Sequence, residues 1–503
     1  MNNLTNNAPN TATKLEIFKG KLATLKNNGT ILSIKDLAEE LFDLTLEEAS
    51  TELGIRDDPM GKQATQATQI LKIYLILSDE GCRRVVELRS RGWHDNREEG
   101  DEHFRQQRKR ADSTTPEEER SFYRMMQQIG DEMHKCHHIF TIPFVPDGQV
   151  NILDLCMAPG GYTAAALSHR NGFKAYGITL APESGGHTVI IDKNRLQGLR
   201  FHDITMYKEF CPSDKEIPEF FRSRFSDVRP FKSIKYHLVF ADGKTLRTHD
   251  RIKDTYNANL NKETVRLQTS QLILAMNRMH NGGTLVMLLH KVDTWNSAFL
   301  LYTFWKFAEI EVFKPAKKHA TRSSFYMIAK NIKVNHPEAL RAIEEWQEDW
   351  YRATFGGPEN TGLPKEEPTD ETVQELLLEF GPELVKLGHK AWMIQANALS
   401  QTSYAGSTTD EGVNELIEPW VKLGFRKRVW SGLKDIFNDH HEDVKMERGV
   451  GYTPICGRGA GGWAVGSDGQ VITGSGARID EQATAGHTIR TPGDNRAMFM
   501  MGS

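Results

Sequence analysis

The spacing of apolar residues changes twice along the chain, which indicates a central domain between two helical regions. Before the central domain, apolar residues recur at helical spacing, as in Leu37, Leu41 and Leu44 and again in Leu71 and Leu75. The two ends of the chain are too polar to form a packed core. The parts expected, in order, are a disordered leader (1–13), a helical N-terminal region (14–112), the central domain (113–333), a helical C-terminal region (334–445) and a disordered tail (446–503).

A helix is predicted to begin at the N-terminal end of the central domain. Thr115 is placed to be its N-cap, Pro116 occupies the first helical position, and Glu118 completes a capping box. One face of this helix is apolar, and we expect that face to pack on the core. Its residues are Phe122, Met125, Met126, Ile129 and Met133.

Within the central domain, short apolar runs alternate with helical segments. The inner runs are continuously apolar, which is typical of a parallel sheet covered on both faces by helices. The last two runs are joined by a short basic connection and could pair antiparallel at the edge. The fold class predicted is therefore α/β, with a Rossmann-like, mostly parallel sheet. The expected strands are 150–155, 174–178, 199–202, 237–241, 284–289, 309–313 and 325–329; the expected helices from 257 onwards are 257–280, 295–307, 337–351, 371–380 and 383–399.

Composition narrows the class of protein. Of the 503 residues, 63 are Lys or Arg and 67 are Asp or Glu, so the formal net charge of −4 excludes a histone-like excess of positive charge. A local basic face remains compatible with this balance. The five cysteines are scattered without a C-x-x-C pair, which argues against a disulfide framework or a structural zinc site and favours a reducing compartment.

The sequence contains no long apolar run of the kind that spans a membrane, and its first residues lack the apolar stretch of a signal peptide. We therefore expect an intracellular protein with no membrane association. Cytoplasm, nucleus and organelle are not distinguished by these features.

The strongest motif begins where the first expected strand ends. Asp154 is followed by Leu155, Cys156 and Met157, and then by a loop that opens the next helix. Glycines in such a loop let the backbone approach a ligand, and the carboxyl end of a strand is where open α/β sheets bind ligands. The residues of the loop are Ala158, Pro159, Gly160, Gly161 and Tyr162.

This motif resembles motif I of the FtsJ-like ribose 2′-O-methyltransferases, which use S-adenosylmethionine as methyl donor. The resemblance extends over roughly residues 135–331. It implies a seven-stranded Rossmann-like sheet and a glycine loop that holds the methionine part of the cofactor, here from Asp154 to Tyr162. A nicotinamide enzyme would need G-x-G-x-x-G and an acidic residue at the end of the second strand, and neither is present.

Two further residues are cofactor candidates through the resemblance. Thr179 ends the second strand, where many family members carry an acid for the ribose hydroxyls, and its hydroxyl could still make one hydrogen bond. Asp203 follows the third strand, where the family has an aspartate that meets the adenine amino group. The alternative for Asp203 is a strand-end aspartate that caps the next turn.

The family's catalytic Lys-Asp-Lys-Glu tetrad is only partly matched. Asp242 follows the fourth strand and Lys291 the fifth, so both end apolar runs where α/β enzymes place their chemistry. Lys135, 19 residues before Asp154, has the spacing expected of the first lysine, with a solvated helix-end lysine as the alternative. Ser324 stands where the family has its glutamate, and serine cannot act as a carboxylate.

The resemblance implies methyl transfer to an RNA ribose 2′-hydroxyl, with Lys291 as the base and Asp242 orienting it. The incomplete tetrad leaves two alternatives, a methyltransferase with another acceptor and an inactive homologue that binds RNA or a partner. RNA is the expected partner, and the expected structure contains no metal. Basic residues in the last connection could neutralise RNA phosphates or be merely solvated. They are Lys314, Lys317, Lys318, His319 and Arg322.

Overall fold

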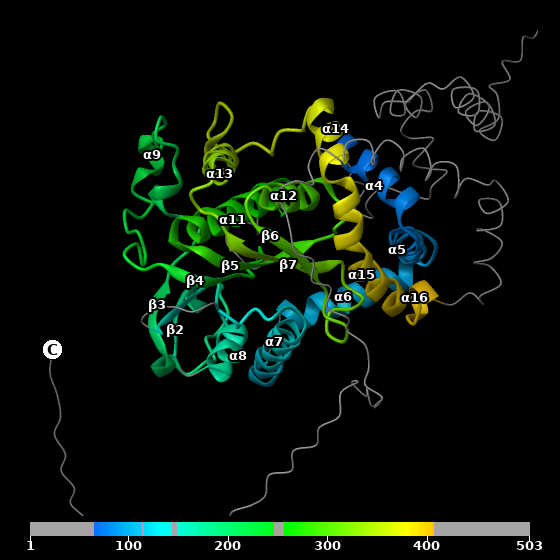
Figure 1. The fold of residues 1–503 in the computed structure, drawn as a ribbon, viewed down its shortest axis with the longest axis horizontal. Coiled ribbons are helices and arrows are strands. Elements are labelled where there is room, and N and C mark those ends of the chain that lie inside the picture. The colour runs from blue at the N-terminus through cyan, green and yellow to red at the C-terminus, as the bar shows by residue number, and fades with distance from the viewer. Residues whose placement is uncertain (1–64, 113–114, 143–147, 171, 246–255, 407–503) are drawn as a thin grey trace, which may run out of the picture. The chain divides into compact units, whose positions relative to one another are not determined.

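The structure is a computed structural model that describes residues 65–112, 115–142, 148–170, 172–245 and 256–406 (Figure 1). The predicted leader, the Leu37–Leu44 repeat and the predicted tail lie outside the described residues. Among the described helices, none is long and apolar enough to cross a membrane.

The central sheet has seven strands in the order β3-β2-β1-β4-β5-β7-β6, with β7 antiparallel to both β5 and β6. The other four pairings are parallel. This confirms the predicted fold class, including the antiparallel edge. The strands are β1 (Val150–Leu155), β2 (Phe173–Thr179), β3 (Leu196–Phe201), β4 (Tyr236–Ala241), β5 (Met279–His290), β6 (Glu309–Phe313) and β7 (Ser324–Ile332).

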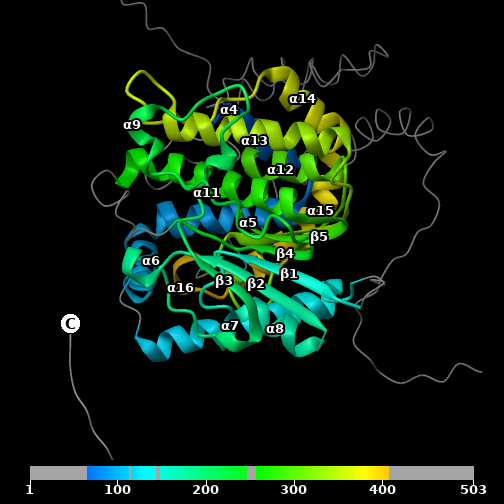
Figure 2. The ribbon, with the colours of Figure 1, turned by 90° about the vertical axis from the view of Figure 1, so that its left-hand side faces the viewer.

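Helices cover both faces of the sheet (Figure 2). On one side lie α11 (Tyr256–Arg278), α12 (Trp295–Trp305) and α13 (Pro337–Phe355), and on the other lie α7 (Pro116–His137) and α8 (Gly161–His169). Because side chains alternate along a strand, β1 supplies both cores: Leu153 packs with the first group of helices, and Ile152 packs with α7 and α8. Both residues are almost fully buried.

The helical additions are α4 (Gln66–Ser78), α5 (Glu80–Ser90) and α6 (Arg97–Asp112) before the sheet, and α14 (Asp370–Glu379), α15 (Gly381–Leu399) and α16 (Ser403–Gly406) after it. Short 3₁₀, π or four-residue helices complete the described chain: η1 (Arg91–Asp95), η2 (Pro182–Ser184), η3 (Lys193–Arg195), η4 (Lys208–Phe210) and α9 (Glu219–Arg222).

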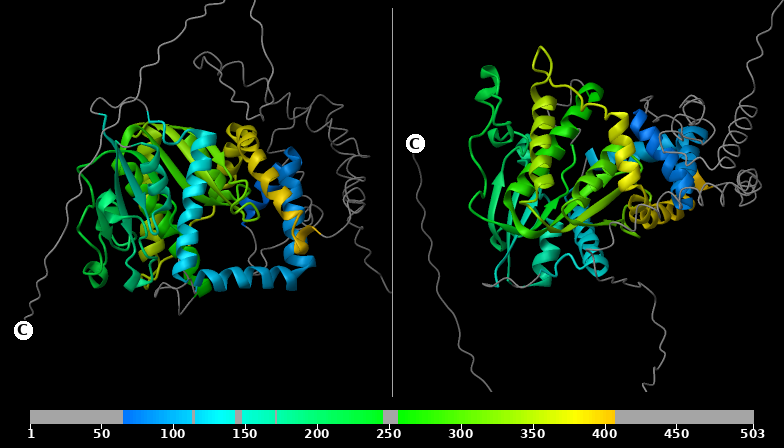
Figure 3. Two further views of the ribbon diagram at one scale, coloured as in Figure 1. Left: turned by 90° about the horizontal axis from the view of Figure 1, so that it is seen from below. Right: turned by 45° about the horizontal axis from the view of Figure 1, so that its top comes forward.

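Although they come from opposite ends of the described chain, α5 and α15 pack side by side (Figures 1 and 3). Leu71, Leu75 and Val85 of the N-terminal helices and Trp392 of α15 join the same buried apolar cluster as the sheet. The flanking helices therefore share the core of the central domain.

The start of α7 has the predicted capping box, in which Thr115 and Glu118 each bond the other's backbone N–H. Met126, Ile129 and Met133 are buried as predicted. The prediction that Phe122 packs in the core is wrong, because its side chain is 37% exposed and lines a cavity. Helical spacing assigned this residue to the correct face but did not reveal that the face ends at a cavity.

Candidate active site

A cavity of about 240 Å³ lies at the carboxyl edge of the sheet. Residues that follow β1, β2, β3 and β4 line it, together with residues of α7 and of the connection between β6 and β7. In an open α/β sheet this edge is the position at which ligands bind. The cofactor candidates that reach the cavity are Ala158, Tyr162, Thr179 and Asp203.

Asp154 supports the loop from behind the cavity. Its carboxylate is buried and accepts a hydrogen bond of 2.6 Å from the Thr163 hydroxyl at the start of α8. Burial raises the pKa of Asp154 well above its ordinary value, and the Thr163 hydrogen bond opposes this rise. Pro159, after a cis peptide bond, accepts backbone hydrogen bonds from Ile190 and Ile191, so Asp154 and Pro159 both fix the shape of the loop.

The two glycines of the loop are required by packing between protein segments. Gly160 has a positive φ of 96°, and a Cβ there would lie 2.5 Å from Ile191 Cγ2. A Cβ on Gly161 would lie 2.4 Å from Met126 Cβ and 2.6 Å from the Tyr123 carbonyl oxygen of α7. Neither glycine is among the residues that line the cavity. Gly161 therefore lets α7 and α8 pack closely, and Gly160 makes room for Ile191 of the connection after β2. That these glycines also let the backbone approach the cofactor stays a prediction.

Replacing Gly161 with alanine should consequently reduce stability before it reduces cofactor binding. Overpacking of this kind costs about 1–3 kcal/mol, which urea unfolding would measure. Gly172→Ala is the matched control, since its Cβ would lie 3.4 Å from the Gly148 carbonyl oxygen, an ordinary contact distance. A change in stability within about 0.5 kcal/mol is expected there. Full stability with lost S-adenosylmethionine binding in Gly161→Ala would instead place this glycine against the cofactor.

Thr179 and Asp203 line the cavity and also form hydrogen bonds with neighbouring loops. The Thr179 hydroxyl accepts the Ala158 backbone N–H at 3.3 Å, and the hydroxyl's own proton remains to be donated. Asp203 Oδ1 accepts the Thr205 backbone N–H at 3.0 Å and the Thr205 hydroxyl at 2.8 Å. Asp203 thus caps the next turn and also lines the cavity, and its contact with the adenine amino group stays a prediction.

Asp242, directly after β4, is one of three carboxylate residues that line the cavity, with Asp203 and Glu263. Burial raises the pKa of Asp242 to about 7, and the positive charge of Lys244 opposes that rise. Among the described residues, no hydrogen-bond partner reaches Asp242 Oδ1, although this atom is buried. A buried acceptor without a partner is costly, so this oxygen is suited to a donor group on a bound ligand.

Two tyrosines form a wall between the glycine loop and the last strand. Their hydroxyls are hydrogen-bonded to each other, from Tyr162 of α8 to Tyr326 of β7. The Tyr162 ring stacks on Phe240 of β4 at a centroid distance of 5.5 Å. Both tyrosine side chains line the cavity, and burial raises the pKa of each hydroxyl, so they are neutral hydrogen-bonding groups there.

The remaining tetrad candidates do not line the cavity. Lys291 follows β5 with a φ of 56°, and its backbone N–H donates to the Ser323 carbonyl at 2.8 Å. Ser324 begins β7 and is paired with His290 across the sheet. Lys135 is exposed in the last turn of α7. The fold brings Asp242 and Lys291 to the same edge of neighbouring strands, but Lys291, Ser324 and Lys135 are not among the residues that line the cavity.

A lysine that the sequence analysis did not consider does line the cavity. Lys244 comes two residues after Asp242, and the carboxylate's charge acts on it, while removal of water lowers its pKa. The position of Lys244 two residues after Asp242, the catalytic aspartate candidate, was the signal in the sequence that could have identified it. The exposed aromatic ring of Phe122 was also missed as a cavity residue.

Some basic side chains of the connection between β6 and β7 are buried, and others are exposed. Lys314 is buried, and its Nζ donates to the carbonyls of His319, Arg322 and Ser324 at 3.2, 2.5 and 2.9 Å. Burial lowers the pKa of Lys314 to about 7 and that of His319 to about 4. His319 and Arg322 line the cavity, and Lys317 is exposed, as is its neighbour Lys318. Lys314 therefore holds the connection in shape from inside and is not one of its exposed cations.

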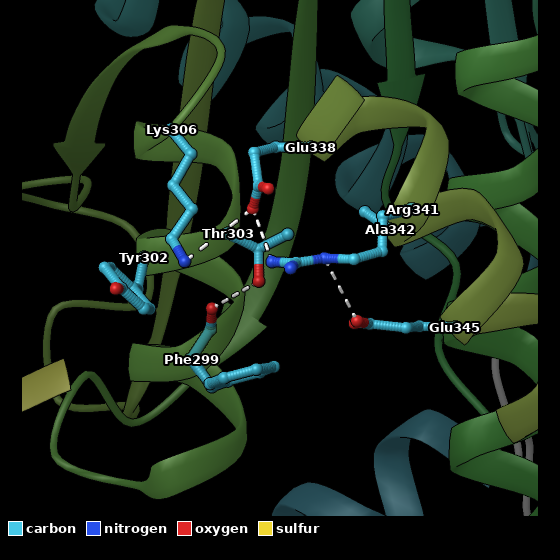
Figure 4. A pocket seen from close by; sticks show the side chains of 8 residues that line it. All are labelled: Phe299, Tyr302, Thr303, Lys306, Glu338, Arg341, Ala342 and Glu345. Carbon is cyan, nitrogen blue, oxygen red and sulfur yellow. Dashed lines mark hydrogen bonds and ion pairs between the residues drawn. The ribbon is translucent and has the colours of Figure 1, made fainter. Parts of the chain in front are cut away.

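A second cavity, between α12 and α13, does not offer a binding site (Figure 4). Glu338 binds both Lys306 and Arg341, and Arg341 also pairs with Glu345. The Thr303 hydroxyl donates to the Phe299 carbonyl, and the Tyr302 hydroxyl bonds Glu375 and Glu379, so these polar groups already have partners within the protein. Among the described residues, no group of three His, Cys, Asp or Glu side chains could hold a metal ion.

The sheet order, its antiparallel last strand and the cavity at its carboxyl edge define a Rossmann-like fold of the methyltransferase class. Residues 131–332 match the FtsJ-like methyltransferase family, which confirms the family resemblance for this part of the chain. S-adenosylmethionine, the predicted cofactor, is the methyl donor that this match implies.

One curated relative is the cap-specific mRNA (nucleoside-2′-O-)-methyltransferase 2 of Drosophila melanogaster, 25% identical over 226 residues. The match covers 42% of this chain and 31% of that protein, so the chain spans about a third of its relative's length.

Two similar solved structures are a ribosomal RNA methyltransferase from Plasmodium falciparum and an rRNA methylase from Streptococcus thermophilus. They are 14% and 13% identical, with TM-scores of 0.26 and 0.24. The matches cover 41% and 40% of this chain and 96% of each of those chains. Similarity this low says nothing further about the chain.

Proposed function

We propose that the chain transfers a methyl group from S-adenosylmethionine to a ribose 2′-hydroxyl of RNA. The observation that carries the proposal is Asp242 Oδ1, a buried acceptor without a partner among the described residues, in a cavity that also contains Thr179 and Asp203. The family match to residues 131–332 and the relative's activity on mRNA support it.

The residues of the cavity fit the cofactor. Asp203 and Thr179 supply strand-end oxygen atoms for the polar groups of a nucleoside, and Tyr162 and Ala158 supply the wall beside them. Asp242 provides a negative charge when ionised, which suits a cation. When bound, S-adenosylmethionine supplies an already activated methyl group, so the protein's task is to align the acceptor and remove its proton.

The chain's own groups would perform that task in two parts. Asp242, when ionised, accepts a hydrogen bond from the acceptor hydroxyl and holds it in position. A lysine takes the proton, since burial lowers the pKa of a lysine and so makes it a better base near neutral pH. Lys291 is the base that the resemblance implies, and Lys244 is a second candidate favoured by its place in the cavity.

The activity is tested by incubating the full chain with labelled S-adenosylmethionine and capped or uncapped RNA, and mapping the label by mass. A ribose 2′-O-methyl group is the expected product. Methylation of a nucleobase instead would show that the acceptor is not the ribose hydroxyl. This alternative is specific to the chain because Ser324 replaces the family's glutamate. Binding of S-adenosylmethionine and RNA without any transfer would identify an inactive homologue.

Alanine at each lysine identifies the base. Replacing the true base should lower the methylation rate by about 10²–10⁴-fold while the affinity for S-adenosylmethionine stays unchanged. Arginine at the same position should not restore the rate, because a guanidinium does not release its proton. Loss with Lys291→Ala alone would support the family's mechanism, and loss with Lys244→Ala alone would move the base to Lys244. Lys135→Ala, on the exposed end of α7, tests the third candidate, and full activity in all three variants would refute a lysine base.

A further inference from the structure

A buried polar network joins both helical additions to the edge of the sheet beside the cavity. Arg89 of α5 binds both carboxylate oxygens of Asp293 at 2.9 Å, and Asp293 lies just after β5. The same guanidinium donates to Gln395 Oε1 of α15 at 2.7 Å. The Asp293 side chain is 1% exposed and that of Arg89 is 12% exposed.

The network continues into the connection between β6 and β7. Gln395 Nε2 donates to the Thr321 carbonyl at 3.2 Å and to the Ser323 hydroxyl at 3.1 Å. These two residues flank Arg322, which lines the cavity. From inside, Lys314 Nζ holds the carbonyl of the same arginine. The connection is therefore fixed by α15 on one side and by a buried lysine on the other.

The electrostatics indicate that the network is kept charged. The positive charges of Arg89, Lys72 and Lys291 hold the pKa of Asp293 well below its ordinary value, although burial alone would raise it. Arg89 Nη1 contacts both oxygens of Asp293 while Nη2 donates to Gln395, so the ion pair fixes the orientation of the guanidinium that reaches Gln395. Stability alone does not require this arrangement, because well-packed apolar residues replace buried ion pairs without loss in many proteins.

We propose that Gln395, oriented by Arg89, is a positioning residue that presents Arg322 to a phosphate group of the substrate RNA. This inference rests on the proposed function and assigns a role to the helical additions, which the family match to residues 131–332 does not include. The ligand class is the RNA phosphodiester, since Arg322 lines the cavity and a guanidinium matches a phosphate in charge and in geometry.

The test compares RNA binding and methylation in the full chain with those of Gln395→Met, which keeps the length of the side chain and removes its hydrogen bonds. The expected result is about a tenfold rise in KM and Kd for RNA, with unchanged affinity for S-adenosylmethionine and nearly unchanged kcat. The salt dependence of RNA binding should lose about one unit of slope, as for Arg322→Ala. The double variant should be no weaker than Arg322→Ala alone, because both changes remove one contact.

His389→Ala is the matched control. His389, whose side chain is 56% exposed, also joins α15 to the N-terminal helices, through a contact with Asp79 at 2.7 Å. This variant should bind RNA like the unmodified chain. Additive effects of Gln395→Met and Arg322→Ala, or equal effects of Gln395→Met and His389→Ala, would overturn the inference. If the unmodified chain bound no RNA, the proposed function itself would fail, which separates the two results.

Discussion

Replacing Asp242 with asparagine should lower the rate of methyl transfer by about 10²–10⁴-fold, because the amide cannot act as the carboxylate that orients the acceptor hydroxyl. The side chain keeps its size, so the fold and the S-adenosylmethionine site should remain. Single-turnover methylation, with cofactor affinity measured by calorimetry, tests this result. A variant with unchanged rate and unchanged cofactor affinity would remove Asp242 from the mechanism.

The same substitution should raise stability at alkaline pH. Burial raises the pKa of Asp242 to about 7 in the folded chain, above the value of about 3.9 in an unfolded chain. The folded state therefore holds the proton more tightly, and stability falls as pH rises through the interval between the two values. At about pH 8 Asp242→Asn should be more stable than the unmodified chain by about 2–4 kcal/mol, and below about pH 4 the difference should vanish.

Urea unfolding at several pH values, without cofactor, measures this difference. Equal stabilities across the whole range would mean that Asp242 is ionised at no cost in the folded chain. We expect a catalytic carboxylate to reduce stability, because active sites retain groups that are needed for function although they do not stabilise the fold.

The second large effect is predicted far from the cavity, at the ion pair of Glu209 and Arg278. Arg278 binds both carboxylate oxygens of Glu209 at 2.8 and 2.9 Å, and the two side chains are 6% and 4% exposed for Glu209 and Arg278 respectively. Glu209→Ala should cost about 3–5 kcal/mol, because it leaves a buried guanidinium without its counter-charge. The Pro230 carbonyl, which accepts from Arg278 Nε at 3.0 Å, cannot replace that charge.

An exposed ion pair provides the control for this prediction. Arg341 and Glu345 lie 3.5 Å apart with side chains 57% and 51% exposed. Glu345→Ala should change the free energy of unfolding by less than about 0.5 kcal/mol. Similar losses in Glu209→Ala and Glu345→Ala would show that burial does not control the contribution of these pairs.

The sequence predicted the sheet well because its signal is local. The limits of β1 and β6 match the predicted runs, because a short apolar segment between polar residues favours a buried strand. The burial of a side chain could be predicted only where the helical or strand spacing of apolar residues was sufficient to assign it. Phe122 has the spacing of a core residue, and only the three-dimensional packing reveals the cavity in front of it.

The candidate site was predicted less completely, and the reason is burial. A basic residue in a connection has the same sequence signature whether it faces RNA or the interior, so Lys314 was grouped with Lys317 although it is buried. The contact of Arg89 with Gln395 joins residues 306 positions apart. No periodicity or motif relates positions at that distance, so the role of the helical additions could not be inferred from the sequence.

The pairing of α5 with α15 also has a consequence for synthesis of the chain on the ribosome. All seven strands have been made once residue 332 is complete, yet the apolar face of α5 must wait for Trp392 and its neighbours to emerge. During that interval Val85 and Leu88, which are buried in the finished structure, have no covering helix from α15. Nascent chains in this state are prone to aggregation and are bound by chaperones. A fragment that keeps α5 but ends at residue 332 should for the same reason be less soluble than the chain that includes α15.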